Sequence, residues 1–141
     1  MPRGAPQCKR EAVTKAGATL IECEPTLAAR QGTCDAIVKE TGAVFIPPYN
    51  HPWVIAGQGT IALEVLSQVQ DAGAIVVPVS GGGMLSGIVV AAKALNPGVR
   101  VIAAEVSGTN DAADVAKSFR AGQFVPCDKP DVRGGPGRAG A

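Results

Sequence analysis

The sequence predicts an α/β protein with a doubly wound, mostly parallel sheet, and three observations support that prediction. Strand-type and helix-type segments alternate along the chain, which is the order that builds a parallel sheet from β–α–β units. Residues 74–79 and 99–106 are continuous apolar runs rich in β-branched side chains, as in parallel strands covered on both faces. Three consecutive glycines, Gly81 to Gly83, separate the first run from an Ala-rich helical pattern.

The first half of the chain predicts two short strands and two helices. We expect a strand at residues 18–23, followed by a helix that starts at Glu24-Pro25-Thr26, where proline is tolerated in the first turn. That helix runs to about residue 41, and a second strand at 43–46 ends at two prolines, which cannot continue a ladder. Apolar side chains recur on one helical face over residues 54–69, so a second helix is expected there.

The second half of the chain continues the alternation of strands and helices. After the strand at 74–79, a helix is expected over 84–95, because Asn96-Pro97-Gly98 stops it. The strand at 99–106 is followed by a helix over 111–121. Residues 126–141 hold few apolar side chains and many Gly and Pro residues, which predicts a disordered tail behind one domain at 1–125.

Composition and charge exclude several classes of function. The 141 residues are 46% hydrophobic and 18% charged, which suits one domain with a buried core. A formal net charge of +1 provides no basic face for nucleic acid, and no uninterrupted apolar stretch is long enough for a membrane span. The four cysteines form no Cys-x-x-Cys pair, so we expect reduced thiols in a cytoplasmic protein without a nucleic-acid or membrane partner.

The segment Ser80-Gly81-Gly82-Gly83-Met84 predicts an anion site, with a phosphate group as the expected ligand. Glycines let the backbone approach a ligand closely, and the N–H groups of a helix's first turn have no partner inside the helix. The alternative is a glycine-rich turn that only joins a strand to a helix. Met84 stands where a nucleoside-triphosphate loop needs a lysine, which argues against that class of site.

Two classes of cofactor remain open for this loop. A dinucleotide site needs Gly-x-Gly-x-x-Gly, but counting from Gly81 the third position is Ser86, and Gly87 comes one residue late. Glu105 does lie 22 residues after Gly83, at a strand end, where a ribose-binding acid is expected. A monophosphate cofactor bound only through loop amides, such as pyridoxal phosphate, needs neither a lysine nor a third glycine.

The segment from Glu105 to Asp111 is a second candidate site. It lies between a strand end and a helix start, and its two carboxylates suit a hard cation such as Mg²⁺ or Ca²⁺. The alternative is structural, with Asp111 or Asn110 capping the helix and Glu105 as a partly buried acid.

Three other features are given structural interpretations. His51, the only histidine, is expected to be structural or solvated rather than catalytic, and Trp53 is expected to pack against other side chains. Cys8-Lys9-Arg10 is interpreted as a solvated face, with a basic turn near a ligand as the alternative.

Four blocks of the sequence resemble one enzyme family. The blocks are Gly4-Ala-Pro-Gln-Cys-Lys9, residues 54–64 with Gly-Gln-Gly-Thr-Ile-Ala, residues 77–87 with the glycine loop, and Ala103-Ala-Glu105. In this order they resemble serine racemases and biosynthetic threonine dehydratases, which are fold-type II pyridoxal-phosphate enzymes. The resemblance spans about residues 4–130 and implies part of the α/β domain of those enzymes.

The resemblance also implies ligands and the residues that bind them. The cofactor phosphate would be held by backbone N–H groups of Ser80, Gly81, Gly82, Gly83 and Met84. A divalent cation would be held by Glu105, a carbonyl of Thr109 and Asp111, and Tyr49 would lie beside the cofactor ring. The family racemises serine or eliminates water from serine or threonine, so a small amino acid is the implied substrate, and a homo-oligomer is an expected assembly.

The chain also departs from the family's pattern. The Ser-x-Lys-x-Arg-Gly motif that supplies the Schiff-base lysine is absent, and the six lysines lie in other contexts. We therefore expect an internal fragment that has no racemase or dehydratase activity of its own. Two other interpretations stay open, namely a non-catalytic binding module or partner of a full-length homologue, and a fragment of a Rossmann-type dinucleotide-binding oxidoreductase.

Overall fold

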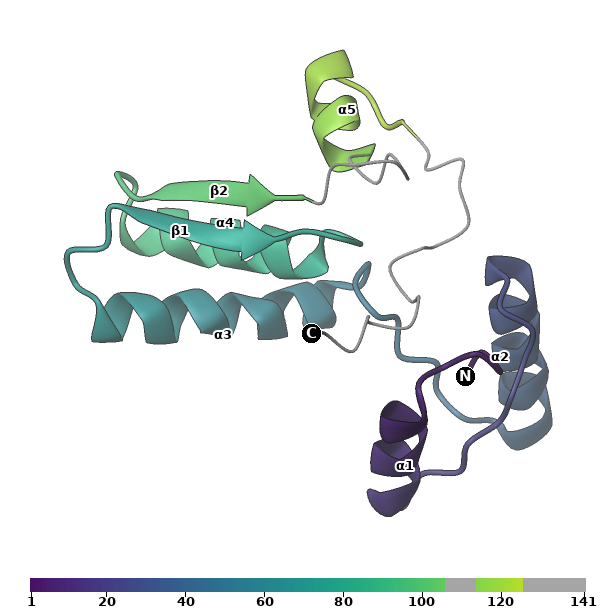
Figure 1. Cartoon of the computed structure of the whole chain (residues 1–141). Helices are drawn as coiled ribbons and strands as arrows, with labels where there is room; N and C mark the ends of the chain where they lie inside the picture. Colours follow the sequence, from purple (N-terminus) through teal and green to yellow (C-terminus); the bar gives the residue numbers. More distant parts are fainter. Residues whose placement is uncertain (106–113, 126–141) are drawn as a thin grey trace, which may run out of the picture. The chain divides into compact units, whose positions relative to one another are not determined.

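The computed structural model describes residues 1–105 and 114–125, which form two compact units. The described part of the first unit is residues 1–45, and the second unit spans residues 46–126 apart from the segment that is not described. Figure 1 labels the elements that are described, in chain order. They are α1 (Gln7–Lys15), α2 (Leu27–Thr41), α3 (Pro52–Gln68), β1 (Ala74–Pro78), α4 (Gly83–Leu95), β2 (Arg100–Ala104) and α5 (Asp114–Ala121).

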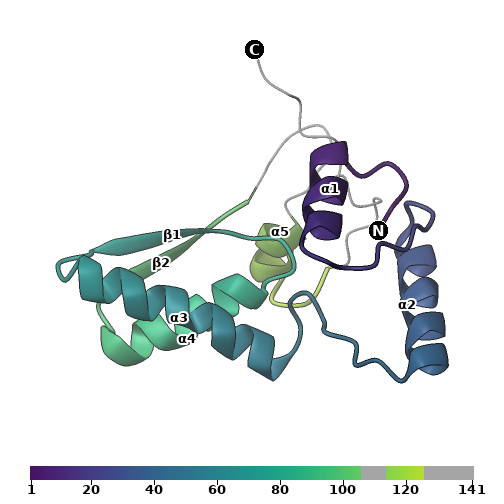
Figure 2. The same ribbon diagram turned by 90° about the horizontal axis from the view of Figure 1, so that it is seen from below.

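The second unit is built on a β–α–β arrangement. Strands β1 and β2 pair in parallel, with Ala74 opposite Arg100 and Pro78 opposite Ala104, and α4 connects them. Helix α4 contacts both strands, and α3 runs alongside α4 (Figures 1 and 2). The carboxyl ends of both strands therefore meet at one edge of the sheet, where ligands bind in open parallel sheets.

A small apolar core holds this unit together. Ala62 of α3, Val77 of β1 and Ile88 and Ala92 of α4 are buried, together with Val99 just before β2. These side chains are aliphatic and contact one another, so their removal from water is the main favourable contribution to folding of this unit.

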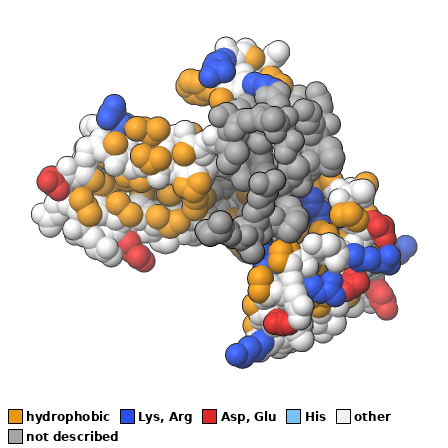
Figure 3. Space-filling model, viewed as in Figure 1, with side chains coloured by type: hydrophobic (Ala, Val, Ile, Leu, Met, Phe, Trp, Pro, Cys, Tyr) orange, Lys and Arg blue, Asp and Glu red, His pale blue; other side chains and the backbone are white. Residues whose placement is uncertain are grey.

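The opposite face of the sheet is exposed in the described part of the chain. Successive strand residues point to opposite faces, and Val76 and Ile102 are 64% and 42% exposed. Figure 3 shows apolar side chains gathered over this part of the unit. Within the described residues the helices cover one face of the sheet, and the predicted α/β class with a parallel sheet is confirmed.

Two glycines allow α3 and α4 to approach closely. A methyl group placed on Gly87 would lie 2.2 Å from the carbonyl oxygen of Ile55, and one placed on Gly59 would lie 3.1 Å from the carbonyl oxygen of Gly87. Both glycines are buried. Backbone thus contacts backbone at this crossing, and a side chain at Gly87 would push the two helices apart.

A lysine side chain closes the C-terminal end of α4. The ammonium group of Lys93 donates to the carbonyl oxygens of Pro97 at 3.1 Å and Val99 at 2.6 Å. Cations near a helix C-terminus are favoured by the helix dipole and by its unpaired carbonyls. The turn between α4 and β2 is therefore fixed by Lys93 as well as by the backbone.

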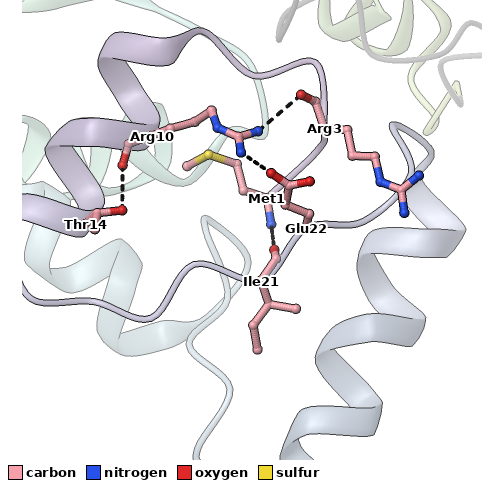
Figure 4. Close-up of polar contacts among 6 residues, drawn as sticks. All are labelled: Met1, Arg3, Arg10, Thr14, Ile21 and Glu22. Carbon is pink, nitrogen blue, oxygen red and sulfur yellow. Dashed lines mark hydrogen bonds and ion pairs between the residues drawn. The ribbon is translucent and has the colours of Figure 1, made fainter.

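The first unit is held mainly by contacts at its surface, since α1 and α2 contain no buried residue. Two ion pairs involve the segment after α1: Arg3 near the start of the chain pairs with Glu24 at 2.8 Å, and Arg10 of α1 pairs with Glu22. The terminal amino group of Met1 donates to the carbonyl oxygen of Ile21 at 2.6 Å (Figure 4). These contacts hold residues 1–3 alongside residues 21–24.

Several predicted elements are confirmed and others are wrong. The helices α2, α3 and α4 and the strands β1 and β2 lie within three residues of their predicted bounds, and Thr26 caps α2 by accepting from the Ala29 N–H at 3.1 Å. The predicted strand at 18–23 forms a single bridge, between Pro2 and Cys23, and residues 43–46 form no strand. A strand needs a neighbour to complete its hydrogen bonds, and the described residues supply none to these two segments.

Helix α1 was not predicted, and Cys8-Lys9-Arg10 within it was interpreted as a solvated face. The helix is strongly polar and has no buried residue, so apolar side chains gave little signal of it. The predicted tail at 126–141 and the first three residues of the predicted helix at 111–121 lie outside the described residues. Cys8, Cys23 and Cys34 are free thiols, and no described helix has the length and apolar character to cross a membrane.

Candidate functional site

The glycine loop leaves β1 at the carboxyl edge of the sheet. The Val79 N–H still donates to the Ala104 carbonyl at 2.9 Å, so pairing extends one residue past the strand, and α4 begins at Gly83. Gly82 stands at the N-cap with φ +86°, in the left-handed region that glycine adopts at little cost. This turn points the first amides of α4 away from the helix interior.

The loop amides are available to a ligand. Of the N–H groups from Gly81 to Ser86, only that of Ser86 has a backbone acceptor within the described residues, the Gly82 carbonyl at 2.9 Å. No side chain caps α4, and its first turn holds no acidic residue. Open amides and the positive end of the helix dipole together favour an anion at this point.

Tyr49 packs directly against the loop. A methyl group on Gly81 would lie 2.2 Å from Cδ1 of the Tyr49 ring, and one on Gly83 would lie 2.6 Å from the Tyr49 carbonyl oxygen. Neither position can therefore carry a side chain while Tyr49 stays in place. Two of the three glycines are thus required by close packing, and Gly82 by its backbone conformation.

A cavity of about 320 Å³ opens beside the loop. This volume is at the lower end of the range for small-molecule and cofactor sites. Sequence reasoning did not single out Pro48 and Gln58, although Gln58 belongs to the Gly-Gln-Gly block. The cavity is lined by Pro48, Tyr49, Gln58 and residues 78–85.

Glu105 lies next to this loop at the same sheet edge, one residue beyond β2. Its carboxylate accepts from the Val115 N–H at 3.1 Å and from the Ala116 N–H at 2.9 Å, so it caps the N-terminus of α5. Thr109 and Asp111, the other predicted cation ligands, lie outside the described residues. Within residues 1–105 and 114–125, no cluster of three His, Cys, Asp or Glu side chains is placed to hold a metal ion.

His51 has a structural contact at the other side of the cavity. Its Nδ1 accepts from the Trp53 N–H at 3.3 Å, which caps α3, and the two rings meet edge to face with centroids 5.5 Å apart. Trp53 is 84% exposed, so the expectation that it packs against other side chains is wrong. The ring lies at the first turn of α3, where apart from His51 it meets water.

Comparison with known proteins matches this geometry to one family. Residues 1–136 match the family described as "Pyridoxal-phosphate dependent enzyme". The chain is 50% identical over 113 residues to the serine racemase of Arabidopsis thaliana, covering 80% of this chain and 34% of that protein. Neither the match nor the relatives support the dinucleotide-binding alternative.

Two solved structures show the same fold. The structure of maize serine racemase superposes with a TM-score of 0.85 at 41% identity, covering 92% of this chain and 39% of that one. Threonine deaminase isoform 2 of Solanum lycopersicum gives a TM-score of 0.81 at 33% identity over 93% of this chain and 35% of that one. The chain thus spans between a third and two-fifths of the length of these relatives.

Proposed function

The chain belongs to the family of pyridoxal-phosphate-dependent enzymes, and from that premise we propose that its glycine loop holds the cofactor phosphate. The residues are Ser80, Gly81, Gly82, Gly83 and Met84. One observation carries the proposal: the amides from Gly81 to Leu85 have no backbone acceptor within the described residues, in a loop where Tyr49 leaves no room for a side chain at Gly81 or Gly83. A phosphate dianion supplies the acceptors that these donors lack.

The rest of the cavity suits the flat ring of such a cofactor. The Tyr49 side chain and the side chains of Gln58 and Met84 line it, which offers an aromatic face, an amide and a thioether. When bound, pyridoxal phosphate supplies an electron sink for carbanions at the α-carbon of an amino acid. In this chain Tyr49 would orient the ring, and the loop amides would fix the distance of the ring from α4.

The relatives indicate the substrate class. They are named serine racemase and threonine deaminase, so we propose a small hydroxy amino acid as the substrate of the protein's site. The sequence lacks the Ser-x-Lys-x-Arg-Gly motif, and the covalent chemistry of such enzymes needs an activated lysine. The 141 residues by themselves should therefore bind the cofactor without turning over serine or threonine.

A divalent cation is proposed at the neighbouring segment. Glu105, a carbonyl of Thr109 and Asp111 supply the oxygen ligands that Mg²⁺ or Ca²⁺ prefers. The Glu105 carboxylate lies at the start of α5, where its two oxygens accept from the Val115 and Ala116 N–H groups. Titration calorimetry of Mg²⁺ and Ca²⁺ into the chain and into Glu105→Gln should show binding that the variant loses, and equal heats from both proteins would refute this site.

The phosphate site is tested with a ligand pair that isolates the dianion. 4′-Deoxypyridoxine phosphate has the ring and the phosphate but no aldehyde, so it cannot form Schiff bases with surface lysines. Calorimetry of the full chain should show saturable binding of this compound, and binding at least about tenfold weaker for 4′-deoxypyridoxine, which lacks the phosphate. Equal affinity for both compounds would contradict the proposal.

A further inference from the structure

We propose that His51 is a positioning residue for the glycine loop: by capping α3 it fixes the backbone of Tyr49 against Gly83. The proposal rests on the function proposed above for the loop and adds a residue that belongs neither to the loop nor to the residues that line the cavity. Three hydrogen bonds of His51 within the described residues support it.

His51 joins the Tyr49 turn to the first turn of α3. Its N–H donates to the Tyr49 carbonyl at 3.1 Å, and its own carbonyl accepts from the Ile55 N–H at 2.9 Å. Its Nδ1 accepts from the Trp53 N–H at 3.3 Å. Residues 49–51 therefore form a tight turn whose last residue is bound to the helix by main chain and side chain alike.

The carbonyl that His51 orients is the one that contacts the loop. Gly83 is buried, and a methyl group on it would lie 2.6 Å from the Tyr49 carbonyl oxygen and 2.8 Å from the Tyr49 Cα. The main chain of Tyr49, as well as its side chain, therefore abuts the first residue of α4. A shift in the 49–51 turn would therefore move the Tyr49 main chain that packs against the proposed phosphate site at residues 80–84.

The packing of α3 against α4 limits how far the helix start that His51 caps can move. The Gly59–Gly87 crossing brings the backbones of α3 and α4 into contact, so the start of α3 has little freedom relative to α4. The Nδ1 bond then ties residue 51 to that fixed start. Without the Nδ1 bond, His51 keeps its two main-chain hydrogen bonds, but its side chain no longer ties the 49–51 turn to the first turn of α3.

The experiment compares three variants of the full chain. His51→Ala removes the cap, and His51→Asn replaces it with a side chain that caps helices well. Thr26→Ala removes a cap of the same kind from α2 in the first unit, where Thr26 Oγ1 accepts from the Ala29 N–H at 3.1 Å. It controls for the general cost of losing a helix cap.

The first measurement is the affinity for 4′-deoxypyridoxine phosphate. A lost cap should weaken binding by about fivefold in His51→Ala, while His51→Asn stays within about twofold of the parent and Thr26→Ala is unchanged. Equal affinity of His51→Ala and the parent would overturn the proposal, and so would an equal loss in Thr26→Ala. Failure of asparagine to restore binding would also count against a role as a cap.

The second measurement needs no ligand and separates this proposal from the proposed function. The Tyr49 ring lies against Gly81, so its ring current should shift the Gly81 amide and α-proton resonances in a glycine-labelled sample. These shifts should move toward random-coil values in His51→Ala and persist in His51→Asn and Thr26→Ala. If they persist in His51→Ala, the positioning role is wrong. If they move while the parent fails to bind the phosphate compound, the proposed function is wrong and the positioning role stands.

Discussion

The two compact units of this chain are stabilised in different ways. The second unit buries a connected set of aliphatic side chains from α3, β1 and α4 and holds the glycine loop at the edge of that core. The first unit has two helices without a buried residue, and its N-terminal residues are held by ion pairs and backbone hydrogen bonds. Apolar burial contributes far more than exposed ion pairs do, so the two units should respond very differently to substitution.

This difference indicates which of the two units can support a ligand site. A ligand site needs backbone amides held in one geometry, and only a close-packed support holds them so. Here that support is the contact of α3 with α4 and the β1–α4–β2 unit. Substitutions that test the comparison should therefore have their largest effects at the helix crossing and their smallest at the ion pairs of the first unit.

The largest effect is expected at the helix crossing. In Gly87→Ala the added methyl group would collide with the Ile55 carbonyl, which belongs to the backbone and cannot rotate away. We expect a loss of about 3 kcal/mol in the free energy of unfolding, measured by urea denaturation of the full chain. Gly57→Ala in α3 is the matched control: its methyl group meets nothing within 4 Å, so stability should stay the same or rise by less than about 1 kcal/mol. Similar losses in both variants would show that close approach is not the reason for Gly87.

The next effect is expected on ligand binding at the loop. Gly83→Ala would force the Tyr49 main chain away from α4, since the methyl group would lie 2.6 Å from its carbonyl oxygen. Affinity for 4′-deoxypyridoxine phosphate should fall by more than about tenfold, as calorimetry can measure. Gly98→Ala is a control in the turn after α4, where the nearest atom is a movable asparagine oxygen at 3.3 Å. If Gly83→Ala binds the compound as tightly as the parent, the phosphate site proposed at residues 80–84 is wrong.

A smaller effect is expected at the start of α5. Glu105→Ala removes the acceptor of two helix amides and a negative charge at the N-terminus of that helix. Exchange of the Val115 and Ala116 amides with deuterium should become about fivefold faster, corresponding to a loss of about 1 kcal/mol. Glu64→Ala in α3 serves as a control for the loss of one carboxylate. Unchanged exchange at both amides would show that Glu105 does not hold this helix end.

The smallest effect is expected in the first unit. Glu22→Gln removes one partner of the Arg10 ion pair, whose two side chains are 31% and 40% exposed. Water and salt screen such a pair, so stability should fall by no more than about 0.5 kcal/mol. Urea denaturation in low and high salt checks this, and a loss of several kcal/mol would mean that the first unit depends on polar contacts far more than exposed ion pairs allow.

Part of the fold could be predicted because the signal was local. The run at 74–79 and the glycines after it specify a strand, a turn and a helix start within fifteen residues, and β1 and α4 appear where expected. Helix α1 lacked such a signal, because it is strongly polar and contains no buried residue. Residues 18–23 have the composition of a strand, but composition does not provide a neighbouring strand to pair with.

The candidate site, like the fold, was predictable only where its signal was local in the sequence. The loop amides follow from sequence spacing, whereas the contact of Tyr49 with Gly81 and Gly83 joins residues more than thirty positions apart. The cap that Glu105 provides to α5 is likewise tertiary, and reasoning from neighbours in sequence favoured Asp111 or Asn110 for that role. Trp53 was expected to pack against other side chains, and its 84% exposure shows that residue type does not determine burial.

The two hydrogen bonds that Lys93 donates at the end of α4 have a practical consequence for covalent labelling. The Nζ of Lys93 donates to two carbonyl oxygens, and these hydrogen bonds must break before the nitrogen lone pair can attack an aldehyde carbon. Reductive trapping of pyridoxal phosphate with borohydride should therefore mark Lys9, Lys15 and Lys39, for which the described residues show no such pair of hydrogen bonds, before it marks Lys93. A mass spectrum that finds adducts spread over these surface amines would record nonspecific chemistry, and only competition by a compound without an aldehyde would reveal a genuine pocket.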